Sequence, residues 1–209
     1  MRRIVPALVM LCACAAAAQA PEQRAPEQRA LTPVLRQAPP ILPVRRMPPA
    51  LPARGTVQLA FTPWDNAEAM IVEGIRGAKQ QILVQAFSFT SRALAYALIA
   101  ARKRGVDVQV MADREQTYSG EASRIPDLVQ AGVPVVLEVR YQSAHNKVMV
   151  VDAGTADGAV ITGSYNWTYA AQYKNAENVL ILRGNPDIVS AYAANWRRHF
   201  AEALPYAEQ

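Results

Sequence analysis

The chain has 209 residues, of which 51% are hydrophobic, and a formal net charge of +5. This length suits one good-sized domain and argues against two. The positive charge belongs to residues 1–54, which hold eight arginines and two glutamates, whereas residues 55–209 carry a net charge of −1. These values exclude a strongly basic nucleic-acid-binding domain, so any such binding must come from a local basic patch.

The first twenty residues are typical of a secretory signal peptide. Arg2 and Arg3 give a charged start, an apolar stretch follows, and small residues end the segment. Both cysteines, Cys12 and Cys14, lie in this segment, so ordinary cleavage leaves no cysteine for a disulfide framework. Two alternatives stay open: a membrane-spanning anchor, and a lipoprotein signal that places a lipid on Cys14. We expect a periplasmic or secreted protein, tethered to a membrane through its N-terminus if Cys14 is lipidated.

Residues 21–54 predict a Pro-rich disordered linker. They begin with the repeat PEQRAPEQRA and contain nine of the fifteen prolines. Proline removes backbone donors and favours the extended polyproline II conformation, which does not pack into a core. A plain spacer is one interpretation, and a spacer whose arginines rest on an anionic surface is the other.

From residue 55 the chain alternates strand and helix patterns. A strand is predicted at 56–61, followed by a helix that Asp65 or Asn66 caps. The β-rich run at 81–89 is the second strand, and a helix capped by Ser91 follows it.

The second half of this region is richer in strands. A strand at 106–113 and a short helix at 123–132 come first, and four strands then follow without a long helix between them. Those four strands cover residues 133–139, 145–152, 158–164 and 177–184. A last helix opens at Asn185, and its predicted apolar face consists of Ile188, Tyr192, Trp196 and Phe200. The pattern predicts an α/β domain at 55–209, with a mixed, partly antiparallel sheet flanked by helices on both faces.

Polar side chains interrupt the apolar run HNKVMVVD in an ordered way. His145 and Lys147 lie two residues apart, so on a strand they point to the same face. If the strand after them pairs as a neighbour, Ser164 and Asn166 return to the same end. An imidazole, an ammonium, a hydroxyl and an amide together suit the binding of a phosphate group. We expect Asp152 and the returning segment GSYN to close this pocket.

The spacing His-x-Lys-x4-Asp, followed by Gly-Ser-x-Asn, resembles the HKD motif of the phospholipase D superfamily. The segments AFSFTSRALAYALIAARKRGVDVQVMAD and YKNAENVLIL are also similar to the small bacterial endonucleases of that superfamily, the Nuc type. The resemblance covers about residues 57–200. It implies a phospholipase D-like fold and phosphodiesterase activity.

The resemblance also implies roles for single residues. His145 would attack phosphorus and form a phosphohistidine, while Lys147, with Ser164 and Asn166, would bind the phosphoryl oxygens. A second such histidine would protonate the leaving oxygen and later activate water. Asp152 would support the site structurally and electrostatically. Glu177 would hydrogen-bond and orient the histidine.

The chain has one such motif and only two histidines. The second histidine, His199, has no lysine two residues later and lies in the pattern of the last helix, so we expect it at a helix surface or boundary. The second motif should therefore come from another copy of the chain. We expect a two-fold homodimer with the active site at the subunit interface.

The chemistry that the resemblance implies needs no metal and no cofactor. Asp113, Glu115 and Asp127 are scattered along the chain without a spacing typical of metal ligands. We therefore expect no metal site in residues 55–209.

The leading hypothesis is an exported, metal-independent endonuclease that cleaves DNA, or alternatively RNA, with little sequence preference. Candidate contacts to nucleic acid are basic and aromatic residues near the motif. They are Arg102, Lys103, Arg104, Arg114, Lys174, Tyr141, Tyr165, Trp167 and Tyr169. Packing is the alternative role for the aromatic residues among them, Trp167 above all. A phospholipase or phosphatidyl transferase acting on phospholipid is the second hypothesis, and a non-catalytic binding protein is the third.

Overall fold

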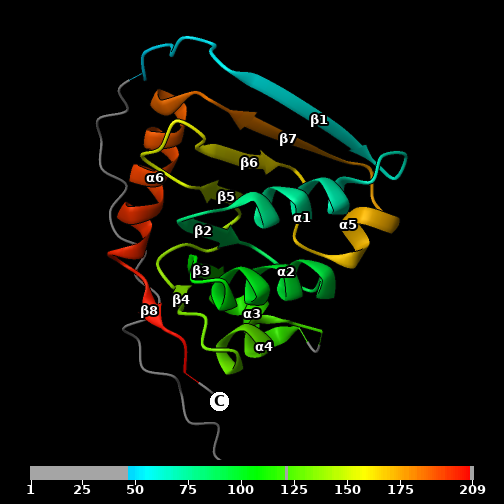
Figure 1. Ribbon diagram of the computed structural model, residues 1–209. Helices are drawn as coiled ribbons and strands as arrows, with labels where there is room; N and C mark the ends of the chain where they lie inside the picture. The colour runs from blue at the N-terminus through cyan, green and yellow to red at the C-terminus, as the bar shows by residue number, and fades with distance from the viewer. Residues whose placement is uncertain (1–46, 121, 208–209) are drawn as a thin grey trace, which may run out of the picture. The chain divides into compact units, whose positions relative to one another are not determined.

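A computed structural model describes residues 47–120 and 122–207, and these residues contain one mixed sheet of eight strands with helices on both faces (Figure 1). The fold class predicted from the sequence is confirmed. The strands are β1 (Thr56–Thr62), β2 (Gln81–Ala86), β3 (Asp107–Asp113), β4 (Val135–Glu138), β5 (Lys147–Val151), β6 (Ala159–Gly163), β7 (Glu177–Arg183) and β8 (Leu204–Pro205). The helices are α1 (Ala67–Gly77), α2 (Arg92–Lys103), α3 (Arg114–Ser119), α4 (Ile125–Gln130), α5 (Tyr169–Tyr173) and α6 (Pro186–Phe200).

The strand order in the sheet is β1-β7-β6-β5-β2-β3-β4-β8. Strands β2, β3 and β4 run parallel to one another, and the remaining pairs are antiparallel. Strands β5 and β6 form the expected antiparallel pair, with Val148 opposite Thr162. The end of β6 therefore lies beside the beginning of β5, as the predicted return of GSYN toward Lys147 requires.

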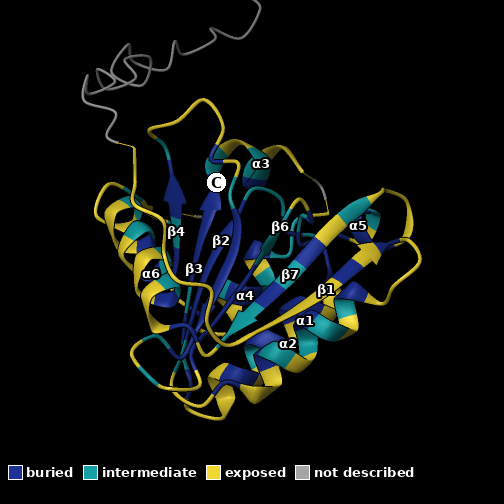
Figure 2. Ribbon diagram, turned by 90° about the horizontal axis from the view of Figure 1, so that it is seen from above, coloured by how far each residue is buried: buried dark blue, intermediate teal, exposed yellow. Residues whose placement is uncertain are grey.

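The two faces of the sheet are covered by different helices. Met149 and Val151 of β5 belong to the larger core, which contains the buried faces of α1 and α2. Val148 and Val150 belong to the smaller core, where Trp196 of α6 is buried. Because all four side chains are buried, β5 is fixed from both sides, and Figure 2 shows the neighbouring β2 and β3 as similarly buried.

Helix starts follow the predicted capping residues. Asn66 caps α1 by accepting from the backbone of Ala69, and Ser91 caps α2 in the same way. The other candidate for the first cap, Asp65, instead accepts from the backbone of Phe61. Helices α3 and α5 were not predicted, although α4, which is as short as α3, was; with five or six residues a helical period is a weak signal.

The buried face of α6 differs from the predicted one. Of the four residues assigned to that face, Trp196 is buried, whereas Phe200 is 40% exposed. Val189 and Ala193 complete the buried stripe instead. These two side chains are smaller than those of Ile188 and Tyr192, and a pattern based on large apolar residues does not detect them.

The predicted signal segment 1–20, with Cys14, lies outside the described residues, as does most of the predicted linker 21–54. The part of that linker at 47–54 has no helix or strand, and the carbonyl of Pro52 accepts a hydrogen bond from the side chain of Asn185.

No helix in the described part of the chain is long and apolar enough to span a membrane.

Candidate active site

The predicted site residues other than Asp152 gather at the end of the sheet where β2 ends and β5 begins. The parallel ends of β2 and β3, the start of β5 and the end of β6 all meet there, as the pairing of Ala86 with Lys147 shows. The sequence predicted a strand from His145, but β5 begins at Lys147. His145 lies in the preceding segment, which is tied to β2 by a hydrogen bond from the Phe87 backbone to the Asn146 carbonyl (3.1 Å).

The side chains of His145 and Lys147 contact the same aromatic ring. The rings of Phe87 and His145 have centroids 4.4 Å apart, and the Lys147 ammonium lies 4.8 Å from the centroid of the Phe87 ring. The prediction that the two residues share a face is therefore confirmed. The His145 side chain is exposed, and its imidazole is accessible to a substrate.

Lys147 is buried, with 5% of its surface exposed. Its ammonium donates a hydrogen bond to the carbonyl of His145 (2.7 Å), so it also fixes the backbone of that histidine. Burial lowers the pKa of the Lys147 ammonium, and the nearby Glu177 carboxylate partly opposes this shift. An ammonium with two further hydrogen atoms, held in a partly desolvated place, is suited to bind a phosphoryl oxygen.

Glu177 joins the cluster from β7. Its carboxylate accepts from the Ser164 hydroxyl (2.5 Å) and from the Asn175 amide (2.9 Å). The predicted contact of Glu177 with the histidine is not among its hydrogen bonds in the described chain. Ser164 in turn accepts from the backbone of Asn178 (3.1 Å), so the serine hydroxyl is part of a network at the ends of β6 and β7.

The loop after β6 is held by two buried aromatic residues, Tyr165 and Trp167, each 1% exposed. The Trp167 indole donates to the carbonyl of Gln85 in β2 (2.9 Å). Asn166 lies between them, and its side-chain oxygen is buried without a hydrogen-bond partner. Tyr165 and Trp167 pack in the core and are not the surface contacts to nucleic acid that the sequence suggested.

Asp152 lies at the opposite end of β5 from Lys147, so it does not close the pocket as the sequence predicted. Its carboxylate accepts from three consecutive backbone amides, those of Lys79, Gln80 and Gln81, at 2.7–2.9 Å. It is 3% exposed and has a positive φ of 49°. This geometry agrees with the structural support that the resemblance implies and not with direct contact to a substrate.

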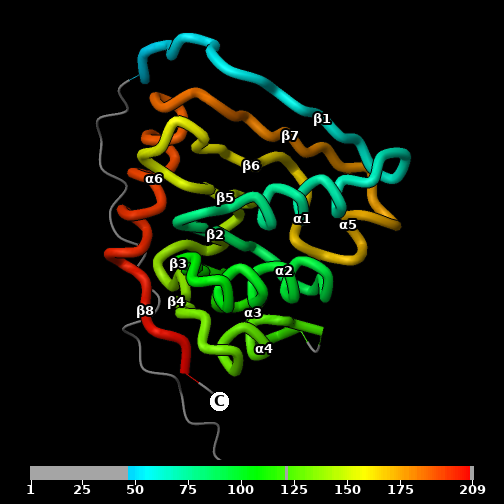
Figure 3. The backbone as a smooth tube through the Cα atoms, viewed as in Figure 1, coloured from blue at the N-terminus to red at the C-terminus, as the bar shows by residue number. Residues whose placement is uncertain are grey.

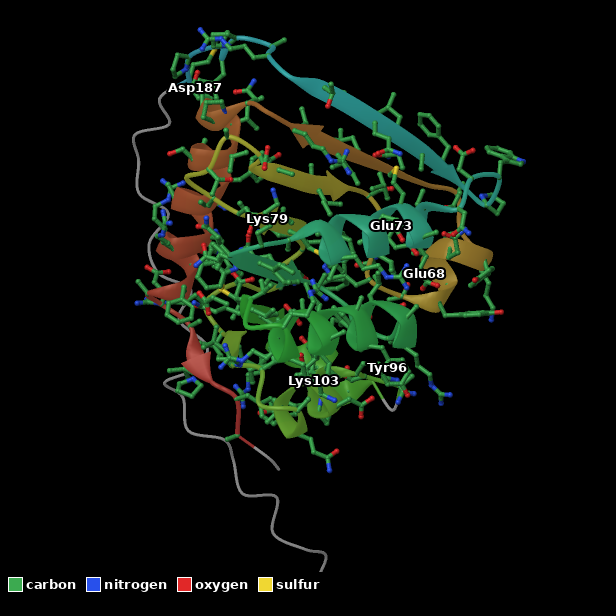
Figure 4. All side chains as sticks on the ribbon, viewed as in Figure 1. Glu68, Glu73, Lys79, Tyr96, Lys103 and Asp187 are labelled. Atoms are coloured by element: carbon green, nitrogen blue, oxygen red, sulfur yellow. The ribbon has the colours of Figure 1, made fainter. Side chains whose placement is uncertain are left out.

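Three of the predicted nucleic-acid contacts, Arg102, Lys103 and Arg104, end α2 at the edge of the sheet far from the site. Figure 4 shows Lys103 and Tyr96 toward opposite ends of α2. The Arg104 guanidinium donates to the last carbonyls of α1. Arg104 therefore binds the end of α1, and the sequence could not place these three cations because it does not give the direction of a helix relative to the site.

The other predicted contacts lie on the site edge. Helix α5 connects β6 to β7 there (Figure 3) and exposes Tyr169 and Tyr173, whose ring centroids are 4.5 Å apart. The Lys174 ammonium lies 6.0 Å from the Tyr169 ring. Arg114 follows β3 at this edge, and Tyr141, which is 45% exposed, precedes His145 in its loop.

Within the part of the chain that the structure describes, no three His, Cys, Asp or Glu side chains gather as they would around a metal ion. Asp113 caps α3, and Asp127 pairs with Arg124.

His199 has a more specific environment than the sequence suggested. Its ring Nδ1 makes a short hydrogen bond to the carboxylate of Glu138, which is buried at the end of β4. The histidine is thus engaged with a carboxylate and is not part of the Lys147 cluster.

Phe87 is the contact that sequence reasoning missed. Phe87 follows β2 in the run AFSF, and the second phenylalanine of that run, Phe89, is buried in the core. Nothing in the sequence separates the two phenylalanines, because only the pairing of β2 with β5 places Phe87 against His145.

Comparison with known proteins gives consistent similarities. The family described as "Cardiolipin synthase, PLD-like domain" matches residues 71–202. A protein named phospholipase D from Rickettsia typhi is 34% identical over 144 residues, which are 69% of this chain and 68% of that protein. A mitochondrial cardiolipin hydrolase from Xenopus laevis is 36% identical over 141 residues, which are 68% of this chain and 64% of that protein.

Solved structures agree with this match. The phospholipase D family member Nuc from Salmonella typhimurium has a TM-score of 0.69 at 30% identity, over 74% of this chain and all of that one. NucT from Helicobacter pylori has a TM-score of 0.65 at 21% identity and shares the fold.

Proposed function

The chain belongs to the phospholipase D-like family and is a phosphodiesterase of that superfamily. We propose that it is an exported endonuclease that hydrolyses DNA without a metal. The observation that carries the proposal is the exposed imidazole of His145 beside the buried ammonium of Lys147, both against the Phe87 ring. A nucleophile open to solvent next to a fixed cation is what attack on a phosphodiester requires.

The proposed reaction has two steps. An imidazole nitrogen of His145 attacks phosphorus, a nitrogen–phosphorus bond forms, and the bond to the leaving oxygen breaks. That oxygen takes a proton from a second imidazole. Water then attacks the phosphohistidine, gives its proton to the second imidazole, and the nitrogen–phosphorus bond breaks.

In both steps Lys147 and Asn166 stabilise the negative charge on the phosphoryl oxygens. Glu177 keeps the cluster together through Ser164, and its carboxylate opposes the lowering of the Lys147 pKa by burial. Asp152 acts only through the fold.

Nucleic acid is the preferred substrate because of the surface beside this cluster. Tyr169 and Tyr173 expose aromatic rings next to Lys174, and such rings stack on bases while cations bind the backbone. The similarity to Nuc, which covers all of that chain, favours the same choice. DNA is proposed first and RNA second.

A second copy of the chain is proposed to complete the site. The chain supplies one histidine to the cluster, since His199 is bonded to Glu138. An apolar stripe of Val57, Leu59 and Phe61 is 50–58% exposed on the edge strand β1. Figure 2 shows β1 as mainly exposed along its length.

The last residue of this stripe, Phe61, lies at the same end of the strands as the site, two strands away from β6. Phe61 pairs with Asn178, and the backbone of Asn178 donates to Ser164. The mechanism needs His145 of two copies at one phosphate, and we propose that the stripe is part of the two-fold contact that joins the copies. Replacing Phe61 with glutamate should give monomers in sedimentation velocity and abolish cleavage, and a fully active monomer would contradict the dimer.

Export, with or without a lipid on Cys14, is proposed from the first twenty residues. N-terminal sequencing of the mature protein tests it, and a blocked terminus with an attached lipid supports the lipoprotein alternative.

One experiment tests the proposed activity. The full chain is incubated in EDTA with plasmid DNA, structured RNA or phosphatidylglycerol vesicles, beside a His145→Ala variant. DNA cleavage that survives EDTA and disappears in the variant supports the proposal. Headgroup release without cleavage of either nucleic acid would instead favour a phospholipase, the activity suggested by the names of several relatives.

A further inference from the structure

The position of His145 depends on the loop that carries it. This loop, residues 139–146, joins β4 to β5, and the His145 side chain is exposed at its end. A nucleophile must be held within a fraction of an ångström of its attack position, and displacement by about 1 Å can cost a factor of about 100 in rate. The groups that fix this loop therefore matter for the reaction.

The backbone on both sides of His145 is fixed. The amide of Ala144 donates to the buried carboxylate of Asp113 (2.8 Å), and the carbonyl of Asn146 accepts from the Phe87 amide (3.1 Å). These bonds tie the last part of the loop to the ends of β3 and β2.

The first part of the loop rests on the end of α6. The ring of Tyr141 lies 5.1 Å from the ring of His199, measured between centroids. The Arg140 guanidinium lies 3.9 Å from the carboxylate of Glu202, just after the helix. The position of the loop therefore depends on the position of this end of α6 relative to the end of β4.

Glu138 and His199 fix that relative position by joining β4 to α6. The Nδ1 of His199 is hydrogen-bonded to one carboxylate oxygen of Glu138, whose side chain is 2% exposed. The other oxygen is buried without a partner, and Asp113 lies opposite Glu138 in the β3–β4 pairing. Burial raises the pKa of the Glu138 carboxyl, and Asp113 adds to the shift.

A buried pair of this kind adds little stability compared with apolar side chains of similar size. The pair instead fixes a position. Because a hydrogen bond to a charged group depends on direction, it determines where the last turn of α6 lies relative to the end of β4.

We propose that Glu138 and His199 are positioning residues, which lock the last turn of α6 against the 139–146 loop and so hold His145 in place for attack. The second histidine of the chain thus acts in the reaction through the first. This inference rests on the proposed role of His145 as the nucleophile.

The test uses variants of His199 that separate its two contacts. His199→Asn keeps an N–H donor for Glu138, whereas His199→Phe keeps a ring for Tyr141 but removes the donor. We expect His199→Phe to lower kcat about 10- to 100-fold with KM changed less than about twofold, and His199→Asn to restore most of kcat. The matched control is Arg197→Phe, an exposed neighbour on α6, which should retain full activity.

A double variant, Glu138→Leu with His199→Phe, distinguishes positioning from stability. Apolar replacement of the pair should recover the urea midpoint of the wild-type chain but leave kcat low. Recovery of kcat together with stability would overturn the proposal, since the pair would then be merely structural.

A measurement independent of activity keeps the inference separate from the proposed function. Because the chain has only two histidines, 13C labelling of histidine gives two ring signals in NMR. In folded His199→Phe the His145 signal should move or broaden as its ring leaves Phe87, whereas an unchanged signal would refute the positioning role. Absence of nuclease activity in the wild-type chain would refute the proposed function alone.

Discussion

Replacing Asp152 with alanine should destabilise the fold while leaving the chemistry of folded molecules intact. The substitution removes the acceptor of three backbone hydrogen bonds, from Lys79, Gln80 and Gln81. Loss of a hydrogen bond in a folded protein costs about 1 kcal/mol, which gives about 3 kcal/mol for the three bonds. The positive φ of 49° costs alanine about 1 kcal/mol more, which gives a total of about 4 kcal/mol.

Urea unfolding followed by tryptophan fluorescence measures this loss, because Trp167 and Trp196 are buried. Asp152→Asn should lose only about 1–2 kcal/mol, since asparagine tolerates a positive φ and retains one acceptor oxygen. The control is Asp157→Ala, whose carboxylate is exposed and pairs with Lys79, and it should leave the urea midpoint unchanged.

Phosphodiesterase activity of the Asp152→Ala variant, measured at low temperature and corrected for the folded fraction, should stay within about threefold of wild type. A loss of 100-fold or more with an unchanged urea midpoint would contradict a purely structural role of Asp152. Asp152 would then take part in the chemistry from the far end of β5.

Three further predictions concern stability and pH. Gly163→Ala should lower the free energy of unfolding, measured by urea unfolding, by about 3 kcal/mol, because the added Cβ would lie 2.1 Å from the Asn178 carbonyl oxygen. Unchanged stability would contradict this close contact. Glu177→Gln should move the alkaline limb of the pH–rate profile to lower pH, because burial lowers the pKa of Lys147 and the carboxylate opposes that shift; an unmoved limb would show that the two groups are not coupled. Burial raises the pKa of Glu138, so the native state holds a proton that the unfolded state has released, and stability should fall as pH rises between the two pKa values. Glu138→Gln should flatten that slope, and an identical slope in the variant would assign it to another group.

The long elements of the fold could be predicted from the sequence because each has its own signal. Asn66 and Ser91 mark helix starts, and the apolar residues of β5 mark a strand buried on both faces. Two of the three short helices had no such signal. Helix α5 has five residues and α3 has six, so their formation is decided by the neighbouring strands and not by local periodicity.

The site could be predicted only where neighbours in sequence are also neighbours in space. His145 and Lys147 lie together because they flank the start of one strand, and Ser164 joins them through the β5–β6 pairing. Phe87 reaches them through the pairing of β2 with β5, which no motif encodes. Asp152 follows Lys147 closely in sequence, but the strand between them places it at the opposite end of β5.

The identity of the nucleophile is tested most directly by trapping it. The full chain is mixed in EDTA with a DNA oligonucleotide, quenched under alkaline conditions that preserve phosphohistidine, and digested for mass spectrometry. We expect a phosphoryl adduct carrying one DNA fragment on the peptide that contains His145, and neither adduct nor cleavage in His145→Ala. Cleavage that continues in His145→Ala, or that stops in EDTA, would contradict a metal-independent phosphohistidine mechanism at this site.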